Sequence, residues 1–178
     1  MILRGKAHKF GNDINTDYII AGKYKARILD WEELAKHCME DADPAFSSKM
    51  SPGDFIVAGT NFGCGSSRET APRVIRAAGV SAVLAQGFAR IFFRNSINVG
   101  LPAVECDTTI IEDGDDLEVD LAAGTVRNLT KGTETKVAPL PGVMMELLND
   151  GGLVEHIKKW GRFNLQGVTS RPTPQGRL

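Results

Sequence analysis

Cysteine and histidine are scarce in this sequence, with three of each in 178 residues. The cysteines, Cys38, Cys64 and Cys106, are odd in number and far apart along the chain. That arrangement fits a reducing, cytoplasmic setting better than a disulfide framework. The cysteines also lack the close spacing of a zinc or iron–sulfur site. We therefore expect this chain alone to bind no metal.

Excess charge and long apolar runs are absent as well. The formal net charge of −1 gives no electrostatic attraction for nucleic acid or for an anionic membrane surface. No run approaches the roughly 18 apolar residues of a membrane span, and the first six residues, MILRGK, do not form a signal peptide. We expect no nucleic-acid partner and no membrane association. The hydrophobic content of 42% is typical of a soluble globular domain.

Strand-like and helix-like segments alternate across the first two thirds of the chain. The expected strands lie over residues 1–10, 54–58, 81–85 and 101–105. The expected helices begin at about Asp30, just before Pro72 and at residue 88, and the last two end at Gly79 and residue 99. Residues 21–27 have three cations and no apolar period, which indicates a loop. This alternation predicts βαβ units and a partly parallel sheet.

Beyond residue 107 the pattern changes to short β-like segments, 117–121 and 125–129, that end near Val137. They predict an antiparallel meander, followed by short helices around 143–148 and 153–160. The predicted fold class is α/β, a mixed sheet with flanking helices and a C-terminal antiparallel meander, in one domain over residues 1–162. Residues 163–178 have two prolines, two glycines and no apolar period, so we expect a poorly ordered tail.

The stretch GTNFGCGSSRET, residues 59–70, places three glycines and two adjacent serines between a strand and a helix. Such a turn presents backbone amides to an anion. A helix that began at Ser66 would put the ring of Pro72 in its interior, so we expect the helix to begin within the three residues before the proline. Ser66, Ser67 and Arg68 then stay on the turn. They suit a carboxylate or a phosphate, and a purely structural glycine turn is the alternative.

Other side chains near this turn have two interpretations each. Cys64 is either a reactive thiol or, as is more common between two glycines, a small buried residue. Arg90 and Arg94 lie four residues apart on the expected helix and Asn98 four further on, so the three share a face. That face either holds an acid or a partner chain, or is solvated with ordinary ion pairs.

Three motifs carry a resemblance to a known family. They are residues 15–20 (NTDYII), 61–69 (NFGCGSSRE) and 88–95 (FARIFFRN). In this order and spacing they resemble the small subunit of 3-isopropylmalate dehydratase and its homoaconitase relatives, over about residues 1–160. Those subunits correspond to the swivelling C-terminal domain of aconitase. The fold that the resemblance implies is therefore the swivelling β/β/α domain of aconitase type.

The resemblance implies a hydro-lyase that isomerises a hydroxy di- or tricarboxylate by dehydration and rehydration. The first interpretation is 2-isopropylmalate to 3-isopropylmalate in leucine biosynthesis. A separate large subunit would carry a [4Fe-4S] cluster, so this chain would bind no cofactor and would be active only with that partner. An isolated small subunit could form a homo-oligomer. By the same resemblance Ser66 would be the catalytic base, Ser67 and Arg68 would bind the substrate carboxylate, and Asp17 would be a polar site residue.

In the family that the chain resembles, substrate choice lies in the loop after the Asp17 motif, here residues 22–27. Its Tyr24-Lys25-Ala26-Arg27 is neither a clean apolar version nor the Tyr-Leu-Arg-Thr of homoaconitases, and Thr70 stands where isopropylmalate enzymes commonly carry histidine. Lys25 and Arg27 are therefore candidate substrate-binding residues, although from residue type alone such cations are solvated surface by default. A homoaconitase or methyl-substituted malate dehydratase subunit stays open. A carboxylate-binding module without chemistry and a structural partner domain also stay open.

Overall fold

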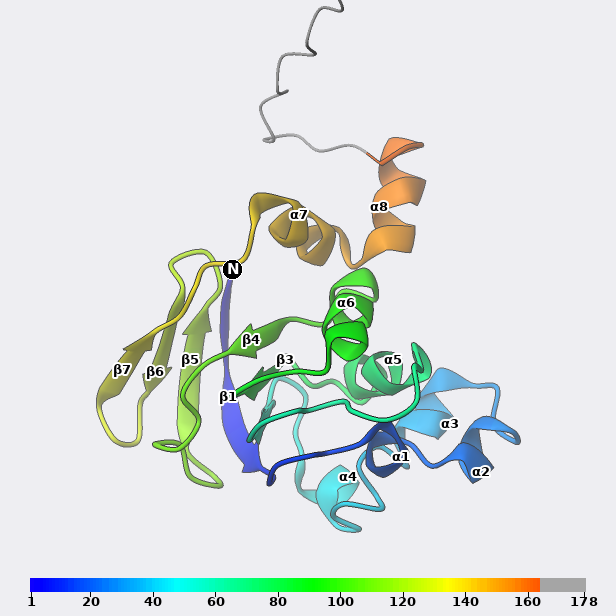
Figure 1. Cartoon of the computed structure of the whole chain (residues 1–178), viewed down its shortest axis with the longest axis horizontal. Helices are drawn as coiled ribbons and strands as arrows, with labels where there is room; N and C mark the ends of the chain where they lie inside the picture. Colours follow the sequence, from blue (N-terminus) through cyan, green and yellow to red (C-terminus); the bar gives the residue numbers. More distant parts are fainter. Residues whose placement is uncertain (164–178) are drawn as a thin grey trace, which may run out of the picture.

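The computed structural model of the protein describes residues 1–163, and in this part of the chain one seven-stranded sheet has the order β4-β3-β2-β1-β5-β6-β7 (Figure 1). The strands are β1 (Ile2–Lys9), β2 (Phe55–Ala58), β3 (Ala82–Ala85), β4 (Ala103–Glu105), β5 (Asp116–Asp120), β6 (Thr125–Asn128) and β7 (Thr133–Lys136). β1 to β4 are parallel, β5 pairs antiparallel with β1, and β6 and β7 continue the antiparallel part. The mixed sheet and the meander are confirmed. From residue 164 onward the expected tail lies outside the described residues.

Eight helices accompany the sheet within residues 1–163. They are α1 (Thr16–Ile19), α2 (Gly22–Lys25), α3 (Trp31–Ala35), α4 (Phe46–Lys49), α5 (Thr70–Ala77), α6 (Arg90–Asn98), α7 (Gly142–Asp150) and α8 (Leu153–Trp160). None of these described helices is long and apolar enough to cross a membrane. The predicted cap of α3 is confirmed, because Oδ1 of Asp30 accepts from the backbone N–H groups of Glu32 and Glu33 at 3.0 and 2.9 Å.

Two helix predictions need correction. The loop expected over residues 21–27 contains one helical turn, α2, closed by a 3.3 Å hydrogen bond from the backbone N–H of Ala26 to the carbonyl of Gly22. A single exposed turn buries no face, so it requires no apolar period. The helix expected from residue 88 begins at Arg90 instead, because the backbone N–H of Ala89 donates to the carbonyl of Phe62 and holds the preceding residues extended.

The start of α5 confirms the argument from Pro72. The helix begins at Thr70, Glu69 makes no side-chain cap, and Pro72 is the third helical residue. Its missing N–H is one of the groups that has no partner inside a helix in any case. Ser66, Ser67 and Arg68 therefore lie before the helix, on the turn.

Both faces of the parallel strands are covered. All four residues of β2 and of β3 are buried. Ile56 and Ala58 point into a core cluster completed by α5, and Phe55 and Val57 point into a second cluster completed by α7. Each Å² of apolar surface removed from water stabilises the fold by about 25 cal/mol, and these strands bury apolar side chains on both faces. Their positions are therefore firmly fixed. The loops that leave their carboxyl ends are thereby held at one edge of the sheet.

Candidate functional site

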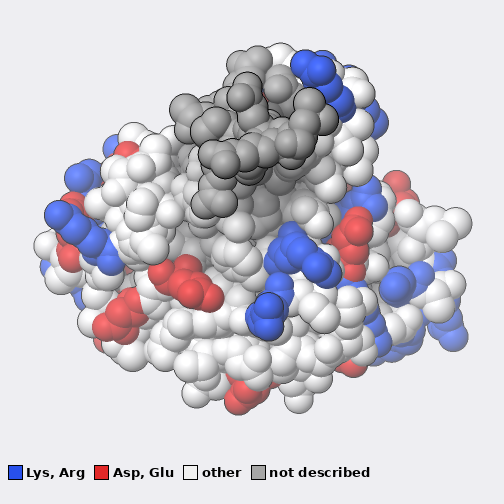
Figure 2. Space-filling model, turned by 45° about the horizontal axis from the view of Figure 1, so that its top comes forward, with Lys and Arg blue, Asp and Glu red and all other residues white. Residues whose placement is uncertain are grey.

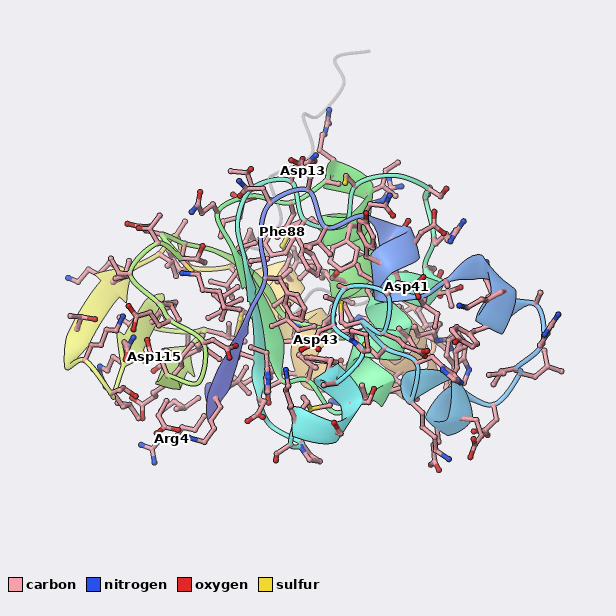
Figure 3. The ribbon with its side chains drawn as sticks, turned by 90° about the horizontal axis from the view of Figure 1, so that it is seen from below. Arg4, Asp13, Asp41, Asp43, Phe88 and Asp115 are labelled. Carbon is pink, nitrogen blue, oxygen red and sulfur yellow. The ribbon has the colours of Figure 1, made fainter. Side chains whose placement is uncertain are left out.

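The three sequence motifs meet at the carboxyl edge of β1, β2 and β3. The backbone N–H of Thr16 donates to the carbonyl of Cys64 at 2.9 Å, which joins the loop after β1 to the glycine turn after β2. On the other side, the backbone N–H of Ala89 donates to the carbonyl of Phe62 at 2.9 Å, which joins the turn to the loop after β3. Seen from below, Asp13 and Phe88 of the two outer loops lie at the same end of the molecule (Figure 3). Ligands of parallel sheets bind at such an edge.

The glycine turn has the left-handed backbone that its sequence anticipates. Gly63 and Gly65 have φ of 78° and 90°. A Cβ on Gly63 would lie 2.1 Å from Cγ of Phe92 on α6. Only glycine allows the turn to approach the helix this closely. The turn and α6 therefore have a fixed separation.

Donors of the turn are free of partners in the structure. Ser66 and Ser67 are exposed, and within residues 1–163 neither hydroxyl has a hydrogen-bond partner. The backbone N–H groups of Ser66, Ser67 and Arg68 also lack an acceptor there. The turn itself is held by Thr16, whose Oγ1 donates to the carbonyl of Ser66 at 3.1 Å. This concentration of unpaired donors is typical of an anion site.

Arg68 and Asp17 are brought together although they are 51 residues apart in sequence. Nη1 of Arg68 donates to Oδ1 of Asp17. The Arg68 side chain is 23% exposed and that of Asp17 is 53% exposed, so water still reaches the pair. Asp17 is held in turn through its backbone N–H, which donates to Oδ1 of Asn15 at 2.6 Å. Four of the six candidate site residues, Ser66, Ser67, Arg68 and Asp17, thus lie in one place.

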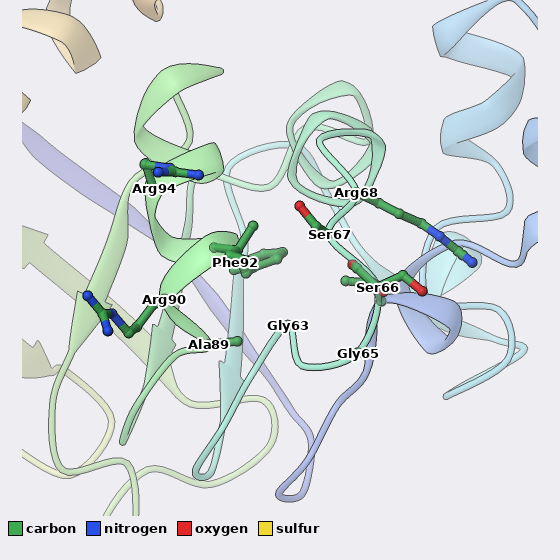
Figure 4. Close-up of a pocket in the computed structure, with 11 residues that line it drawn as sticks. Gly63, Gly65, Ser66, Ser67, Arg68, Ala89, Arg90, Phe92 and Arg94 are labelled. Atoms are coloured by element: carbon green, nitrogen blue, oxygen red, sulfur yellow. The ribbon is translucent and has the colours of Figure 1, made fainter.

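A cavity of about 540 Å³ opens between the turn and α6 (Figure 4). It is lined by Thr16, Gly63, Gly65, Ser66, Ser67, Arg68, Ala89, Arg90, Ile91, Phe92 and Arg94. Its size suits a small organic ligand. The helix face that carries Arg90 and Arg94 is therefore a wall of this cavity. Sequence reasoning missed Thr16, although it stands beside Asp17 in the first motif.

Lys25 and Arg27 lie outside this cavity. Lys25 lines a separate hollow of about 410 Å³ together with Glu69 and Thr70, the residues that follow Arg68. Arg27 is exposed and lines neither space. Lys25 therefore lies near the residues that follow Arg68 and does not share the cavity of the serines.

Tyr24 anchors that segment to the chain that follows α3. Its ring stacks on His37 with centroids 3.8 Å apart, and its hydroxyl donates to Oε1 of Glu40 at 2.9 Å. Nδ1 of His37 lies 2.5 Å from Oε2 of the same carboxylate. Hydrogen bonds from His37 and then from Tyr24 hold the pKa of Glu40 below its usual range. The sequence offered no signal for this contact beyond the spacing of His37 and Glu40.

The thiols show no sign of activation. Burial, and after it the charge of Asp13, raises the pKa of the Cys64 thiol, and burial raises the pKa of Cys106 to about 12. Both thiols stay protonated at neutral pH, which favours the small-residue interpretation of Cys64. Within residues 1–163 no three His, Cys, Asp or Glu side chains converge to hold a metal ion.

Comparison with known proteins identifies close relatives. The sequence model of the aconitase C-terminal domain family matches residues 10–109. The 3-isopropylmalate dehydratase small subunit 2 of Archaeoglobus fulgidus is 58% identical over 165 residues, which cover 93% of this chain and 100% of the relative. The small subunit of Caldicellulosiruptor bescii is 54% identical over 160 residues, 89% of this chain and 96% of the relative.

A solved structure agrees with these sequence relatives. The crystal structure of 3-isopropylmalate dehydratase from Methanocaldococcus jannaschii matches this fold with a TM-score of 0.87 and 48% identity. The match covers 90% of this chain and 96% of that one. The likeness thus extends well beyond the three motifs, to nearly the whole described chain.

Proposed function

The chain belongs to the family of the aconitase C-terminal domain, and on that premise we propose that it is the small subunit of a 3-isopropylmalate dehydratase, a lyase of leucine biosynthesis. The alignments with the relatives of that name cover nearly the whole length of each relative, and more than half of the aligned residues are identical. The observation that carries the proposal is the turn of Ser66, Ser67 and Arg68, whose free donors face a cavity large enough for a substituted malate.

In this proposal Ser66 takes the proton from the carbon next to a substrate carboxylate. A free serine hydroxyl is far too weakly acidic to act as a base at neutral pH. Ser66 therefore acts as its alkoxide. The exposed hydroxyl first gives its proton to solvent, and the free amides of the turn and the guanidinium of Arg68 stabilise the anion until it takes the substrate proton and becomes a hydroxyl again. They also donate to the substrate carboxylate, together with the hydroxyl of Ser67. The ion pair with Asp17 restrains the guanidinium of Arg68.

We assign the [4Fe-4S] cluster of the reaction to a large subunit. The cysteines of this chain do not fit it, because Cys38 is fully buried and no three cysteine, histidine or acidic side chains converge anywhere in residues 1–163. When bound in the partner, the cluster supplies the Lewis acid for the leaving hydroxyl. This chain supplies carboxylate binding and the proton acceptor. We place the complex in the cytoplasm, where its thiols stay reduced.

We further propose that residues 22–27 select the substrate through Lys25 and Arg27. Both lie outside the cavity of the serine turn, so they would meet only the part of a ligand that extends beyond it. If the enzyme also accepts a tricarboxylate, Arg27→Ala is expected to lower kcat/KM for homocitrate more than for isopropylmalate, because a third carboxylate would lose its counter-charge. Initial rates with the two substrates measure this. An equal loss for both would remove Arg27 as a selector.

The experiment that tests the proposal is reconstitution with a cluster-bearing large subunit. We expect no turnover by the chain alone, and turnover of 2-isopropylmalate by the complex that exceeds its turnover of homocitrate and methyl-substituted malates. A carboxylate-binding module would bind these acids and give no turnover with an active partner. A structural partner domain would leave the complex fully active after Arg68→Ala. Either of the last two results would contradict the assignment.

A further inference from the structure

The wall of the cavity opposite the serine turn carries two arginine side chains that have no partner among the described residues. Arg90 and Arg94 both line the cavity from α6. Within residues 1–163 neither guanidinium forms a hydrogen bond or an ion pair, whereas Arg68 on the turn is paired with Asp17. The side chain of Arg127, by contrast, lies between two glutamates that balance its charge. The unbalanced positive charge of the site therefore lies on α6.

Among the residues that the structure describes, no carboxylate lines this cavity to compensate the arginines. Its charged lining residues are all arginines. Over the visible face of the molecule as a whole, by contrast, acidic and basic side chains are interspersed (Figure 2). A cavity with several guanidinium groups and no lining acid selects an anion.

The first turn of α6 adds to this charge. The N-cap residue Ala89 has no side-chain acceptor, and the backbone N–H groups of Arg90, Ile91 and Phe92 have no acceptor within residues 1–163. All four residues line the cavity. The positive end of the helix dipole therefore faces the same space as the arginines.

Of the two arginines, Arg94 is the better placed to reach a ligand held by the serines. In Figure 4 the Arg94 side chain extends toward the side of the serine turn, and that of Arg90 turns away from it. Both are exposed, so each can reorient at little cost in desolvation. Gly63 keeps the turn in contact with α6 and so sets the distance across which a ligand is shared.

We propose that Arg94 binds the second carboxylate of a dicarboxylate ligand whose first carboxylate is held by Ser67 and Arg68. The proposal rests on the function proposed above, since a substituted malate carries two carboxylates and the turn offers only one guanidinium, that of Arg68, whose Nη1 is on Asp17. Each carboxylate then meets a guanidinium on its own wall of the cavity. The substrate is thereby fixed at both ends, which orients the carbon between them toward Ser66.

Binding of 2-isopropylmalate to the isolated full-length chain tests this without relying on turnover. The backbone amide shifts of Ser67 and Arg68 would be followed during a titration of the wild type and of the variants Arg94→Gln and Arg90→Gln, and the Arg94 side-chain Nε–Hε shift wherever Arg94 is present. Loss of a charge-assisted hydrogen bond should weaken binding about tenfold in Arg94→Gln. Arg90→Gln removes the same charge four residues away. It should weaken binding less than about threefold, because it reduces only the positive electrostatic potential of the cavity and removes no hydrogen bond to the ligand. Arg162→Gln, distant in sequence and exposed, should have no effect.

The same variants in the reconstituted complex give a second reading. There Arg94→Gln should raise KM about tenfold, with assembly unchanged in analytical ultracentrifugation. The proposal is wrong if the wild-type chain shows no saturable shift, if both variants weaken binding equally, or if Arg94→Gln disrupts assembly while leaving binding intact. The last result would assign Arg94 to the subunit interface. Failure of the proposed function would appear differently, as dicarboxylate binding that depends on Arg94 in a complex without turnover of isopropylmalate.

Discussion

Replacing Gly63 with alanine perturbs the contact that holds the serine turn against α6. The residue has a φ of 78°, and an added Cβ would lie 2.1 to 2.4 Å from three atoms of Phe92. Phe92 is buried among Phe62 and Phe88, with ring centroids 5.1 and 6.2 Å away, so it cannot move aside freely. The substitution therefore combines backbone strain with overpacking.

The two contributions can be separated by a matched glycine. A side chain in the left-handed region costs about 1–2 kcal/mol, and overpacking of a filled core adds about 1–3 kcal/mol. Gly114 has a φ of 83° with no heavy atom within 4 Å of an added Cβ. Gly114→Ala should therefore lose only the first contribution, about 1–2 kcal/mol, and Gly63→Ala about 2–5 kcal/mol.

Thermal and urea unfolding followed by circular dichroism would measure the difference. For a chain of this size 1 kcal/mol corresponds to about 2–4 °C, so Tm of Gly63→Ala should lie about 2–12 °C below that of Gly114→Ala. The urea midpoint should fall in the same order. If Gly63→Ala and Gly114→Ala lost the same free energy of unfolding, the inference that a side chain at residue 63 overpacks against Phe92 would be refuted.

Two further changes separate stability from function. Asp17→Asn should alter the free energy of unfolding by less than about 1 kcal/mol, because its pair with Arg68 is solvent-accessible, yet raise KM in the complex; a large loss of stability would contradict this. Asp150 should stabilise the fold above its ordinary pKa of 3.8 and lose that effect as pH falls toward 2, because hydrogen bonding to Lys159 first, and to Trp160 and His156, lowers its folded pKa to about 2. Asp150→Asn should therefore be less stable than the wild type at pH 6, with a gap that closes toward pH 2; urea midpoints that differ equally at every pH would contradict it.

Local signals explain what the sequence predicted well. Pro72 limits where a helix can begin through its own ring, and Asp30 caps a helix through its nearest amides, so both helix starts followed from a few residues. The alternation of strands and helices similarly led to the parallel half of the sheet. These features depend on contacts within a few positions.

The parts that were wrong or missing depend on tertiary contacts or carry too weak a local pattern. The single turn of α2 and the short α4 have no buried face long enough to leave a period in the sequence. The pairing of Arg68 with Asp17 spans 51 residues. The cavity needs α6 beside the glycine turn, and only the three-dimensional arrangement reveals that Arg90 and Arg94 have no partner within the described part of the chain. The three motifs, in their order and spacing, indicated that these segments act together. Spacing along the sequence does not, however, give the distances or contacts between their side chains in the fold.

The catalytic role proposed for Ser66 is tested most directly by the turnover of 2-isopropylmalate in a complex that contains Ser66→Ala. The exposed hydroxyl has no partner within residues 1–163, so its removal should leave the unfolding transition and subunit assembly unchanged. Loss of a general base should lower kcat by about 10²- to 10⁴-fold, with KM within about threefold of the wild type. Ser66→Ala with the kcat of the wild type would contradict the assignment of the turn as the proton acceptor.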